Sequence, residues 1–331
     1  MTATGPYSIT PTRPPFSPDL LDSLATAQEL LPDFATTDLA VVREAIAAQK
    51  DALDLTVGGS VVHEDVTAPG LGDDPDIMLT IFRPAALPET ALPVIFHIHG
   101  GGMIIGDRFT GVMSFLTHVS EGAAIVVTVE YRLAPEHPDP APVNDCYAGL
   151  RWVGENADAF GGDPERIMVA GTSAGGGLSA GVALMARDRG FPALTHQVLL
   201  CPMLDDRFLT PSSHMLDREG VWDRNANLFG WTALLGERRG GEDVSYYAAP
   251  SRASVEELAG LPPTFLNVGS TETFRDEDLA YAQALSQAGV LVDLVMTGGG
   301  FHGFDGLAPE AKSSKRHSAA LDAYLRDALE G

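Results

Sequence analysis

A serine stands in the middle of a glycine cluster that directly follows an apolar, β-like run in the segment IMVAGTSAGGGLSAG, residues 167–181. The pentapeptide around Ser173 reads Gly-x-Ser-x-Gly, which in a strand–turn–helix context holds a serine hydroxyl up for acyl transfer. The same segment offers Gly175, Gly177 and Ala180 in the order Gly-x-Gly-x-x-Ala, which is typical of a turn that binds the phosphates of a dinucleotide. The two chemistries need different partners elsewhere in the chain.

A second glycine cluster, FHIHGGGMIIGD at residues 96–107, follows a predicted strand. Backbone N–H groups in such a loop face a site without intervening side chains, so they can stabilise the negative oxygen of an acyl-transfer intermediate. The N–H groups of Gly101 and Gly102, together with that of Ala174, are the candidate donors of this oxyanion hole. The two clusters occur in the chain order that acyl transfer requires, which favours the serine chemistry.

A serine becomes a good nucleophile when a base takes its proton and an acid orients the base. After a strand–turn–helix serine, the acid is expected before the histidine along the chain. His302, in the segment GGGFHGFDG after the last predicted strand, is the candidate base. The segment GSTETFRDEDLA after the preceding strand offers the candidate acids Glu272, Asp276, Glu277 and Asp278. Three other histidines do not lie beyond the carboxyl end of a predicted strand: His196, His214 and His317.

Four motifs together resemble the hormone-sensitive lipase family of α/β-hydrolases in order and spacing: HGGG at 99–102, YRLAPEHP at 131–138, GTSAGG at 171–176 and FHGF at 301–304. The resemblance covers about residues 90–310. It implies Ser173 as the nucleophile and His302 as the base. It also implies Gly101, Gly102 and Ala174 as the oxyanion-hole donors. Many members have aspartate at the position of Thr172. The pentapeptide GTSAG of this chain resembles one of the family's two bacterial subgroups.

The acid is where this chain departs from the family, whose usual motif after the seventh strand is D-P-L-x-D-E. The aligned residues here are Glu272-Thr273-Phe274-Arg275-Asp276-Glu277. The resemblance therefore implies Glu272 as the acid, with a longer side chain than the usual aspartate. Asp276, one helical turn later, is the rival candidate, because either carboxylate can orient a histidine.

Two further departures flank the site. Met103 follows the glycines where an aromatic residue is usual, and Asp139 stands where an apolar residue is usual. We expect Glu130, Tyr131 and Arg132 to brace the fold near the site rather than to contact substrate.

Other functions for these glycines, histidines and cysteines account for fewer of the motifs. A dinucleotide turn at residues 175–180 would leave HGGG and His302 without a role. The acidic residue expected about 20 residues after such a turn is also missing. His97 and His99 form an H-x-H pair without an evident third metal ligand, so we expect a sheet histidine and a support for the oxyanion loop. Cys146 and Cys201 are too few for a disulfide framework or a zinc site and are predicted to be small buried hydrophobes.

The elements that position these residues follow from the apolar pattern. The first two strands are predicted to form a hairpin. From about residue 93, near-continuous apolar runs alternate with helical patterns, which indicates a mostly parallel sheet between helix layers. Strands are predicted at 61–68, 77–83, 93–99, 123–131, 166–172, 196–203, 263–269 and 291–297.

Two regions fall outside this alternation and are predicted to form a helical cap, about 1–58 and 205–250. The first contains helical patterns at 17–31 and 36–53, with Thr37 or Asp38 as the N-cap of the second. The second contains a helical segment at 219–237 with an apolar stripe that could serve as cap core or as substrate cradle. The acidic pair Asp205-Asp206 is predicted to be solvated surface. The fold class is thus a single α/β-hydrolase domain over 1–331, with an eight-stranded sheet and a cap.

The composition bears on partners and location. The 331 residues include 21 lysines and arginines against 45 aspartates and glutamates, a formal net charge of −24. Such a surface repels phosphate backbones and anionic lipid, so neither nucleic acid nor stable membrane anchoring is expected. The chain shows neither a signal-peptide pattern nor a run of about 18 apolar residues, and a cytoplasmic location is expected.

The expected activity is hydrolysis of short- to medium-chain carboxylic esters by a serine esterase with a small-molecule substrate. Neither a metal ion nor an organic cofactor is expected. The alternatives are a non-catalytic receptor on the same fold and an amidase or deacetylase using the same triad. Some members of the family dimerise through their last strand and helix, so a homodimer is one expected state.

Overall fold

The computed structural model describes residues 11–30, 37–49 and 52–330. Within these residues one sheet has eight strands in the order β1-β2-β4-β3-β5-β6-β7-β8. β1 pairs with β2, and β2 with β4, in antiparallel register, whereas all other neighbours are parallel. The strands are β1 (Val61–Ala68), β2 (Ile77–Pro84), β3 (Leu92–Ile98), β4 (Ile125–Glu130), β5 (Gly162–Thr172), β6 (His196–Leu200), β7 (Thr264–Gly269) and β8 (Val292–Thr297). The predicted hairpin and mostly parallel sheet are confirmed.

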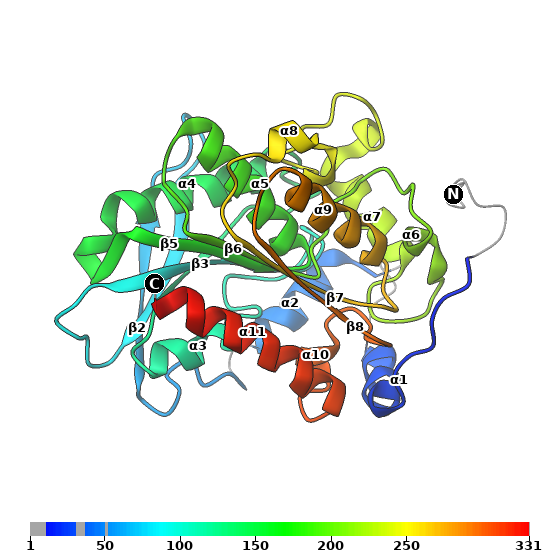
Figure 1. The fold of residues 1–331 in the computed structure, drawn as a ribbon, viewed down its shortest axis with the longest axis horizontal. Coiled ribbons are helices and arrows are strands. Elements are labelled where there is room, and N and C mark those ends of the chain that lie inside the picture. Colours follow the sequence, from blue (N-terminus) through cyan, green and yellow to red (C-terminus); the bar gives the residue numbers. More distant parts are fainter. Residues whose placement is uncertain (1–10, 31–36, 50–51, 331) are drawn as a thin grey trace.

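Helices cover both faces of the sheet (Figure 1). On one side lie α4 (Ala141–Asn156), α5 (Ala174–Arg189) and α9 (Arg275–Gln287), and on the other α3 (Met113–Ser120) and α11 (Lys312–Glu330). Successive strand residues alternate between the two cores, so that Phe96 packs with α4 and α5 while Ile95 packs with α3 and α11. Burial on both faces explains why the central strands are apolar at nearly every position.

Two strand predictions need correction. The near-continuous apolar run of β8 predicts burial on both faces, but Leu294 is 42% and Met296 50% exposed. β8 is an edge strand with a neighbour on one side only, so its side chains are less covered than those of a central strand. β6 ends at Leu200 rather than residue 203, because Cys201 takes a positive φ of 38° and breaks the extended conformation.

The remaining helices lie outside the sheet layers. They are α1 (Leu21–Leu30), α2 (Leu39–Gln49), α6 (Ser212–Met215), α7 (Arg224–Leu235), α8 (Val255–Leu258) and α10 (Phe304–Leu307). Asp38 accepts the N–H of Ala40 at 2.9 Å, in agreement with the predicted cap of α2. Residues 31, 36, 50 and 51 of the two predicted helices lie outside the described residues. The cap boundaries, about 1–58 and 205–250, stay a prediction.

None of the helices in the described part of the chain has the length and apolarity that crossing a bilayer requires.

Candidate active site

Ser173 occupies the sharp turn between β5 and α5. Its φ of 60° and ψ of −123° lie outside the ordinary helix and strand regions, as a nucleophile elbow requires. A Cβ on Gly175 would stand 2.1 Å from the carbonyl oxygen of Ile98, and one on Gly177 would stand 2.1 Å from that of Met203. These glycines allow α5 to pack directly against neighbouring backbone, which leaves no space there for the phosphates of a dinucleotide.

Ser173, His302 and Glu272 form one continuous chain of hydrogen bonds. Ser173 Oγ lies 2.9 Å from His302 Nε2, and His302 Nδ1 lies 3.2 Å from Glu272 Oε1. The second carboxylate oxygen, Glu272 Oε2, accepts the N–H of Gly269 at 3.2 Å. All three side chains belong to residues that are at least nine-tenths buried. Residues far apart in the sequence thus meet in the order that nucleophile, base and acid require.

The rival acid, Asp276, points elsewhere. Its Oδ2 accepts the N–H of Ser212 at 2.8 Å, and its Oδ1 accepts Nε of Arg275 at 2.7 Å. The other histidines are likewise occupied away from the serine. His317 bonds Thr297, His214 bonds the carbonyl of Phe208, and His196 packs against Tyr324.

The HGGG loop lies directly beside the serine. A Cβ on Gly100 would stand 3.3 Å from Cβ of Ser173. Among the residues that the structure describes, the N–H groups of Gly101, Gly102 and Ala174 donate no hydrogen bond in a loop or turn. Three unused donors next to a buried hydroxyl are suited to binding an oxyanion.

His99 supports this loop. Its Nδ1 lies 2.8 Å from the carbonyl oxygen of Gly100, and its ring stacks on Tyr131 at a centroid distance of 4.1 Å. The hydroxyl of Tyr131 donates to the carbonyl of His99 at 3.0 Å. Burial lowers the pKa of His99 to about 4, so the ring is neutral near pH 7. His97 is also buried, with a pKa lowered by burial to about 3, and it packs against Phe115.

Charged residues of the YRLAPEHP region brace the surrounding loops, as predicted. Glu130 accepts Nη1 of Arg108 at 2.9 Å. Arg132 donates to Asp145 at 2.6 Å and to Asp74 at 2.9 Å, and the Asp145 side chain is fully buried.

The two departures beside the site have different surroundings. Met103 is fully buried with a φ of 62°, and its carbonyl accepts the N–H of Ala134 at 2.9 Å. Asp139 accepts Nη2 of Arg238 at 2.8 Å, and its N–H donates to the carbonyl of Leu234 at 3.0 Å. Asp139 therefore fastens the segment between β6 and β7 to the loop before α4.

Trp222 is the member of the apolar stripe that reaches the site. Its ring centroid lies 6.4 Å from that of His302, and Phe274 packs edge-on against the same histidine at 5.2 Å. Trp231, Leu234 and Leu235 are buried in the main core, and Leu228 and Phe229 pack against it. The sequence pattern could not show which member of the stripe faces the histidine.

The segment before α1 holds the loop that carries His302. The N–H of Ser17 donates to the carbonyl of Gly299 at 2.9 Å, and Phe16 packs edge-on against Phe301 at a centroid distance of 6.3 Å. Asp19 accepts the N–H of Ser313 at 2.8 Å. The histidine loop therefore depends on a segment that lies far from it in the sequence.

Arg43 of α2 makes a comparable connection to the oxyanion loop. Its Nε donates to the carbonyl of Ile104 at 2.8 Å, and its Nη2 donates to the carbonyl of Ala134 at 2.8 Å. Its guanidinium also pairs with Glu136 at 2.9 Å. No local sequence pattern signals this role, because the two acceptors are backbone groups.

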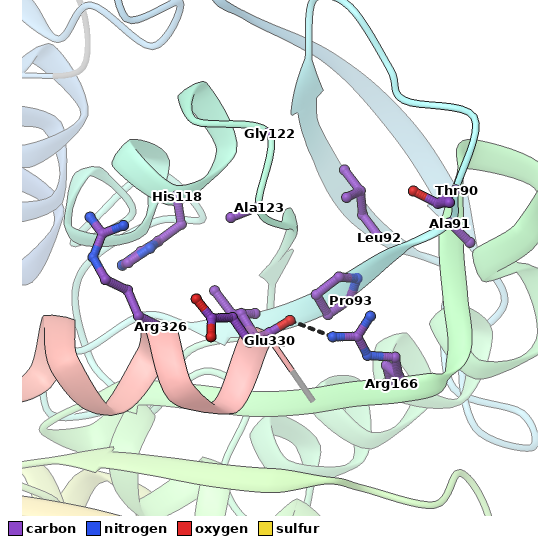
Figure 2. Close-up of a pocket in the computed structure, with 11 residues that line it drawn as sticks. Thr90, Ala91, Leu92, Pro93, His118, Gly122, Ala123, Arg166, Arg326 and Glu330 are labelled. Atoms are coloured by element: carbon purple, nitrogen blue, oxygen red, sulfur yellow. Dashed lines mark hydrogen bonds between the residues drawn. The ribbon is translucent and has the colours of Figure 1, made fainter.

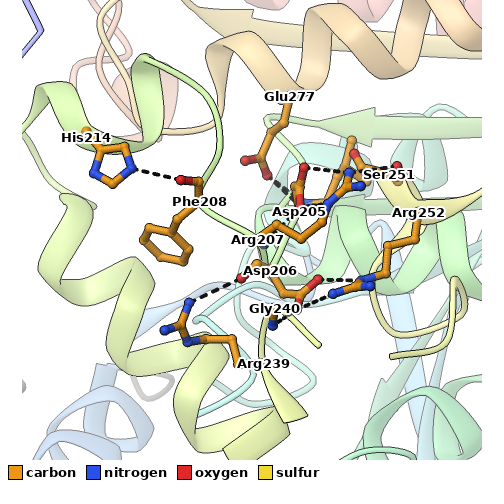
Figure 3. A network of polar contacts seen from close by, with 11 residues as sticks. Asp205, Asp206, Arg207, Phe208, His214, Arg239, Gly240, Ser251, Arg252 and Glu277 are labelled. Carbon is orange, nitrogen blue, oxygen red and sulfur yellow. Dashed lines mark hydrogen bonds and ion pairs between the residues drawn. The ribbon is translucent and has the colours of Figure 1, made fainter. Parts of the chain in front are cut away.

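The prediction that Asp205 and Asp206 form a solvated surface is wrong, since only 7% and 0% of these residues are exposed. Figure 3 shows their partners. Asp205 accepts Nε and Nη2 of Arg207, each at 2.8 Å. Asp206 accepts Nε of Arg252 at 2.7 Å and the N–H of Gly240 at 2.6 Å. The charge of Asp205 is compensated by the nearby Arg207, whereas the partners of Asp206 come from distant parts of the chain.

Glu277 joins the same cluster to α9 (Figure 3). Its Oε1 accepts the N–H groups of Leu204 at 2.8 Å and Asp205 at 3.1 Å. Burial, followed by the charge of Asp205, raises the pKa of Glu277 well above its ordinary value. The helix that follows Glu272 is thereby tied to the segment that leaves β6.

A cavity of about 290 Å³ lies at the opposite edge of the sheet, where β3 begins and α11 ends (Figure 2). Its lining includes Pro93, His118, Arg166 and Arg326. Arg166 donates to the carbonyl of Leu329, and Arg326 pairs with Glu121. Because Ser173 follows the carboxyl end of β5, this cavity is not part of the serine site.

Known proteins resemble this chain over most of its length. A family model described as alpha/beta hydrolase fold matches residues 95–306. Carboxylesterase NlhH of Mycobacterium tuberculosis (strain ATCC 25618 / H37Rv) is 38% identical over 260 residues, covering 76% of this chain and 79% of that protein.

Solved structures agree with this match. A bacterial heroin esterase superposes with a TM-score of 0.85 and 39% identity over 95% of this chain and 98% of the other. The esterase LipW from Mycobacterium marinum superposes with a TM-score of 0.81 and 34% identity over 97% of this chain and 99% of the other.

Proposed function

This chain belongs to the hormone-sensitive lipase family of α/β-hydrolases, and on that premise we propose that it hydrolyses carboxylic esters through an acyl-enzyme on Ser173. The observation that carries the proposal is the buried hydrogen-bond chain from Ser173 through His302 to Glu272, next to three unused backbone donors. A family match alone would not distinguish an enzyme from a receptor on the same fold.

In the proposed reaction His302 Nε2 takes the proton of Ser173 as Oγ attacks the acyl carbon. Glu272 accepts the hydrogen bond from His302 Nδ1–H, which fixes the tautomer with a free lone pair on Nε2 and stabilises the charged ring that forms. The negative oxygen of the tetrahedral intermediate binds the N–H groups of Gly101, Gly102 and Ala174.

Collapse of this intermediate expels the alcohol, which leaves with the proton held on His302. Water then attacks the acyl-serine, giving up its proton to His302, and the same donors stabilise the second intermediate. Release of the carboxylic acid returns the proton to Ser173. No metal ion or organic cofactor is needed at any step.

Burial supports small substrates. Ser173 is only 5% exposed and His302 only 9%. Aromatic rings of Trp222 and Phe274 lie against the histidine. A buried nucleophile suits a single ester molecule with a short or medium acyl chain better than the surface of a fat droplet.

The test is hydrolysis of p-nitrophenyl esters from acetate to palmitate by wild type and Ser173→Ala. Wild type should cleave the short esters, and Ser173→Ala should lose the activity while keeping its circular dichroism spectrum and Tm. Ser179→Ala removes another buried hydroxyl of α5 and should stay active. A wild type that cleaves no ester in the series, or an active Ser173→Ala variant, would overturn the proposal.

The two alternatives make different predictions for the same assay. A receptor would bind small ligands without turnover, and the binding would be detected as a rise in Tm. The intact hydrogen-bond chain from Ser173 to Glu272 favours turnover instead. An amidase or deacetylase would cleave p-nitroacetanilide at a rate comparable to that of p-nitrophenyl acetate. No contact in the described residues favours amides over esters.

The proposal includes a homodimer. β8 is an edge strand with half-exposed Leu294 and Met296, so a second copy could continue the sheet there. Sedimentation velocity of wild type and Met296→Arg tests this point, because the charged variant should be monomeric. The cytoplasmic location stays a prediction.

A further inference from the structure

Cys201 has no role in the proposed reaction, yet its thiol lies beside the triad. It is the first residue after β6, and its backbone N–H is fixed by the carbonyl of Asn267 at 2.9 Å. The backbone N–H of Gly303, the residue after the base, acts on the Cys201 thiol and lowers its pKa, although by less than burial raises it. Cys201 is 7% exposed, so the thiol is enclosed with the histidine loop.

The position of this sulfur completes a set of metal ligands. Sγ of Cys201, one nitrogen of His302 and one carboxylate oxygen of Glu272 all lie within 4.8 Å of one another. Thiolate, imidazole and carboxylate are the donors that Zn²⁺ and related borderline or soft cations prefer. In a tetrahedral zinc site such atoms lie about 3.3–3.8 Å apart, so small side-chain rotations would close the set around an ion.

The charges around the sulfur also favour a cation. Burial, and then the charges of Glu272 and Asp305, raise the pKa of the Cys201 thiol well above its ordinary value. A divalent ion here would lie beside the carboxyl groups of Glu272 and Asp305, in a largely buried part of the site.

From these observations we propose that the active site carries an inhibitory binding site for Zn²⁺ and similar soft divalent cations, formed by Cys201, His302 and Glu272. Mg²⁺ and Ca²⁺ do not bind there, because they prefer sites made of oxygen ligands. The inhibition rests on the proposed function, but the binding of the metal does not.

The inhibition follows from the ligands that the ion takes. A metal on Nε2 of His302 occupies the lone pair that would accept the proton of Ser173. A metal on Nδ1 displaces the hydrogen bond to Glu272 and forces the remaining proton onto Nε2, which removes the base equally. In either case the thiol proton of Cys201 passes to solvent, and a chelator restores activity.

Inhibition is tested on wild type, Cys201→Ser and Cys146→Ser with p-nitrophenyl acetate and free Zn²⁺ set by a chelator buffer. Each rate is expressed relative to that of the same variant without metal. Cys201→Ser should raise the half-inhibitory Zn²⁺ concentration by about tenfold or more, whereas Cys146→Ser, which removes the other buried thiol, should leave it unchanged. Equal inhibition of wild type and Cys201→Ser, or none of wild type, overturns the proposal.

Binding is tested without any activity by adding Co²⁺ to Ser173→Ala protein, which retains all three ligands. A thiolate-to-cobalt absorption band in the near ultraviolet should appear, persist in Ser173→Ala/Cys146→Ser and vanish in Ser173→Ala/Cys201→Ser. A Ser173→Ala protein without the band overturns the site even if a cysteine variant fails to fold. The band is independent of ester cleavage, so its failure and failure of the proposed function are distinguishable.

Discussion

The indole ring of Trp222 lies against the backbone of Gly102, so closely that a Cβ on Gly102 would stand 2.3 Å from Cη2 of the ring. The carbonyl of Trp222 accepts the hydroxyl of Thr273 at 2.7 Å, next to Glu272. One residue of the segment between β6 and β7 therefore contacts both a proposed oxyanion donor and the segment that carries the proposed acid.

Gly102→Ala should lower kcat by about 100-fold or more, because the new methyl group must displace either the indole or the donor N–H. Gly102 has a φ of 61°, so some backbone strain is expected as well. Gly72→Ala is the matched control, since Gly72 has a φ of 66° and no atom within 4 Å of the added Cβ. Steady-state kinetics that show equal losses in kcat for both variants would contradict the proposed donor.

Glu272→Gln should lower kcat by about 10⁴-fold with little change in Tm, because an amide cannot hold the histidine in the required tautomer. Asp276→Asn should change kcat by less than about threefold, since Asp276 bonds Ser212 and Arg275 rather than His302. A larger loss of kcat in Asp276→Asn than in Glu272→Gln would reverse the assignment of the acid.

Arg43→Met should lower kcat by about 10- to 100-fold with little change in KM, because Arg43 holds the carbonyls of Ile104 and Ala134 beside the oxyanion loop. Glu136→Gln removes the partly exposed ion pair and keeps both carbonyl bonds, so it should alter kcat by less than about twofold. If kcat falls equally in both variants, the ion pair with Glu136, and not the hydrogen bonds to the two carbonyls, supports catalysis.

Arg252→Met should lower the free energy of unfolding by about 3–5 kcal/mol, because it leaves the fully buried Asp206 without its ionic partner. Lys315→Met breaks a pair with Glu310 whose side chains are 59% and 88% exposed, and should cost less than about 1 kcal/mol. Urea denaturation at neutral pH measures the free energy of unfolding of both variants. A loss as small in Arg252→Met as in Lys315→Met would show that solvent reaches Asp206.

Asp278→Asn should stabilise the protein increasingly as the pH rises from about 4 to 8. Burial, and then the charges of Glu272 and Glu277, raise the pKa of Asp278 well above its ordinary value. The fold therefore holds the neutral acid. Its stabilising contribution is complete below the pKa of the unfolded chain and is lost as the pH rises from there toward the folded pKa.

The asparagine variant does not titrate and escapes that loss. Urea unfolding of wild type and variant across this pH range measures the difference in stability. Asp73→Asn, at an exposed position, is the control and should show no such trend. A difference that shrinks with rising pH would mean that Asp278 is ionised in the fold.

The sequence alone predicts those parts of the site that consist of consecutive residues. The strand, turn and helix around Ser173 follow from one local pattern, and the HGGG loop and His302 each follow a recognisable strand. Glu272 could be ranked above Asp276 only through a family motif, and the hydrogen bond to His302 appears in the folded chain.

The rest depends on contacts that no local pattern records. Asp206 resembles a solvated residue in the sequence because its partners, the Arg252 side chain and the Gly240 N–H, come from distant parts of the chain. Cys201 lies close to His302 because, in the folded chain, the end of β6 is next to the loop that carries the histidine. The exposure of β8 depends on its place at the sheet edge, which the apolar run LVDLVMT does not encode.

The hydrogen bond between Ser17 and Gly299 also bears on how the protein is made. A ribosome produces the segment around Ser17 long before the glycine loop that receives its N–H group. Contacts between such distant segments close the largest loops and are slow to form. A nascent chain thus carries the serine and its oxyanion donors without a base until His302 is made, 129 residues after Ser173. Hydrolysis begins only when the histidine loop has emerged and paired with a segment made at the outset.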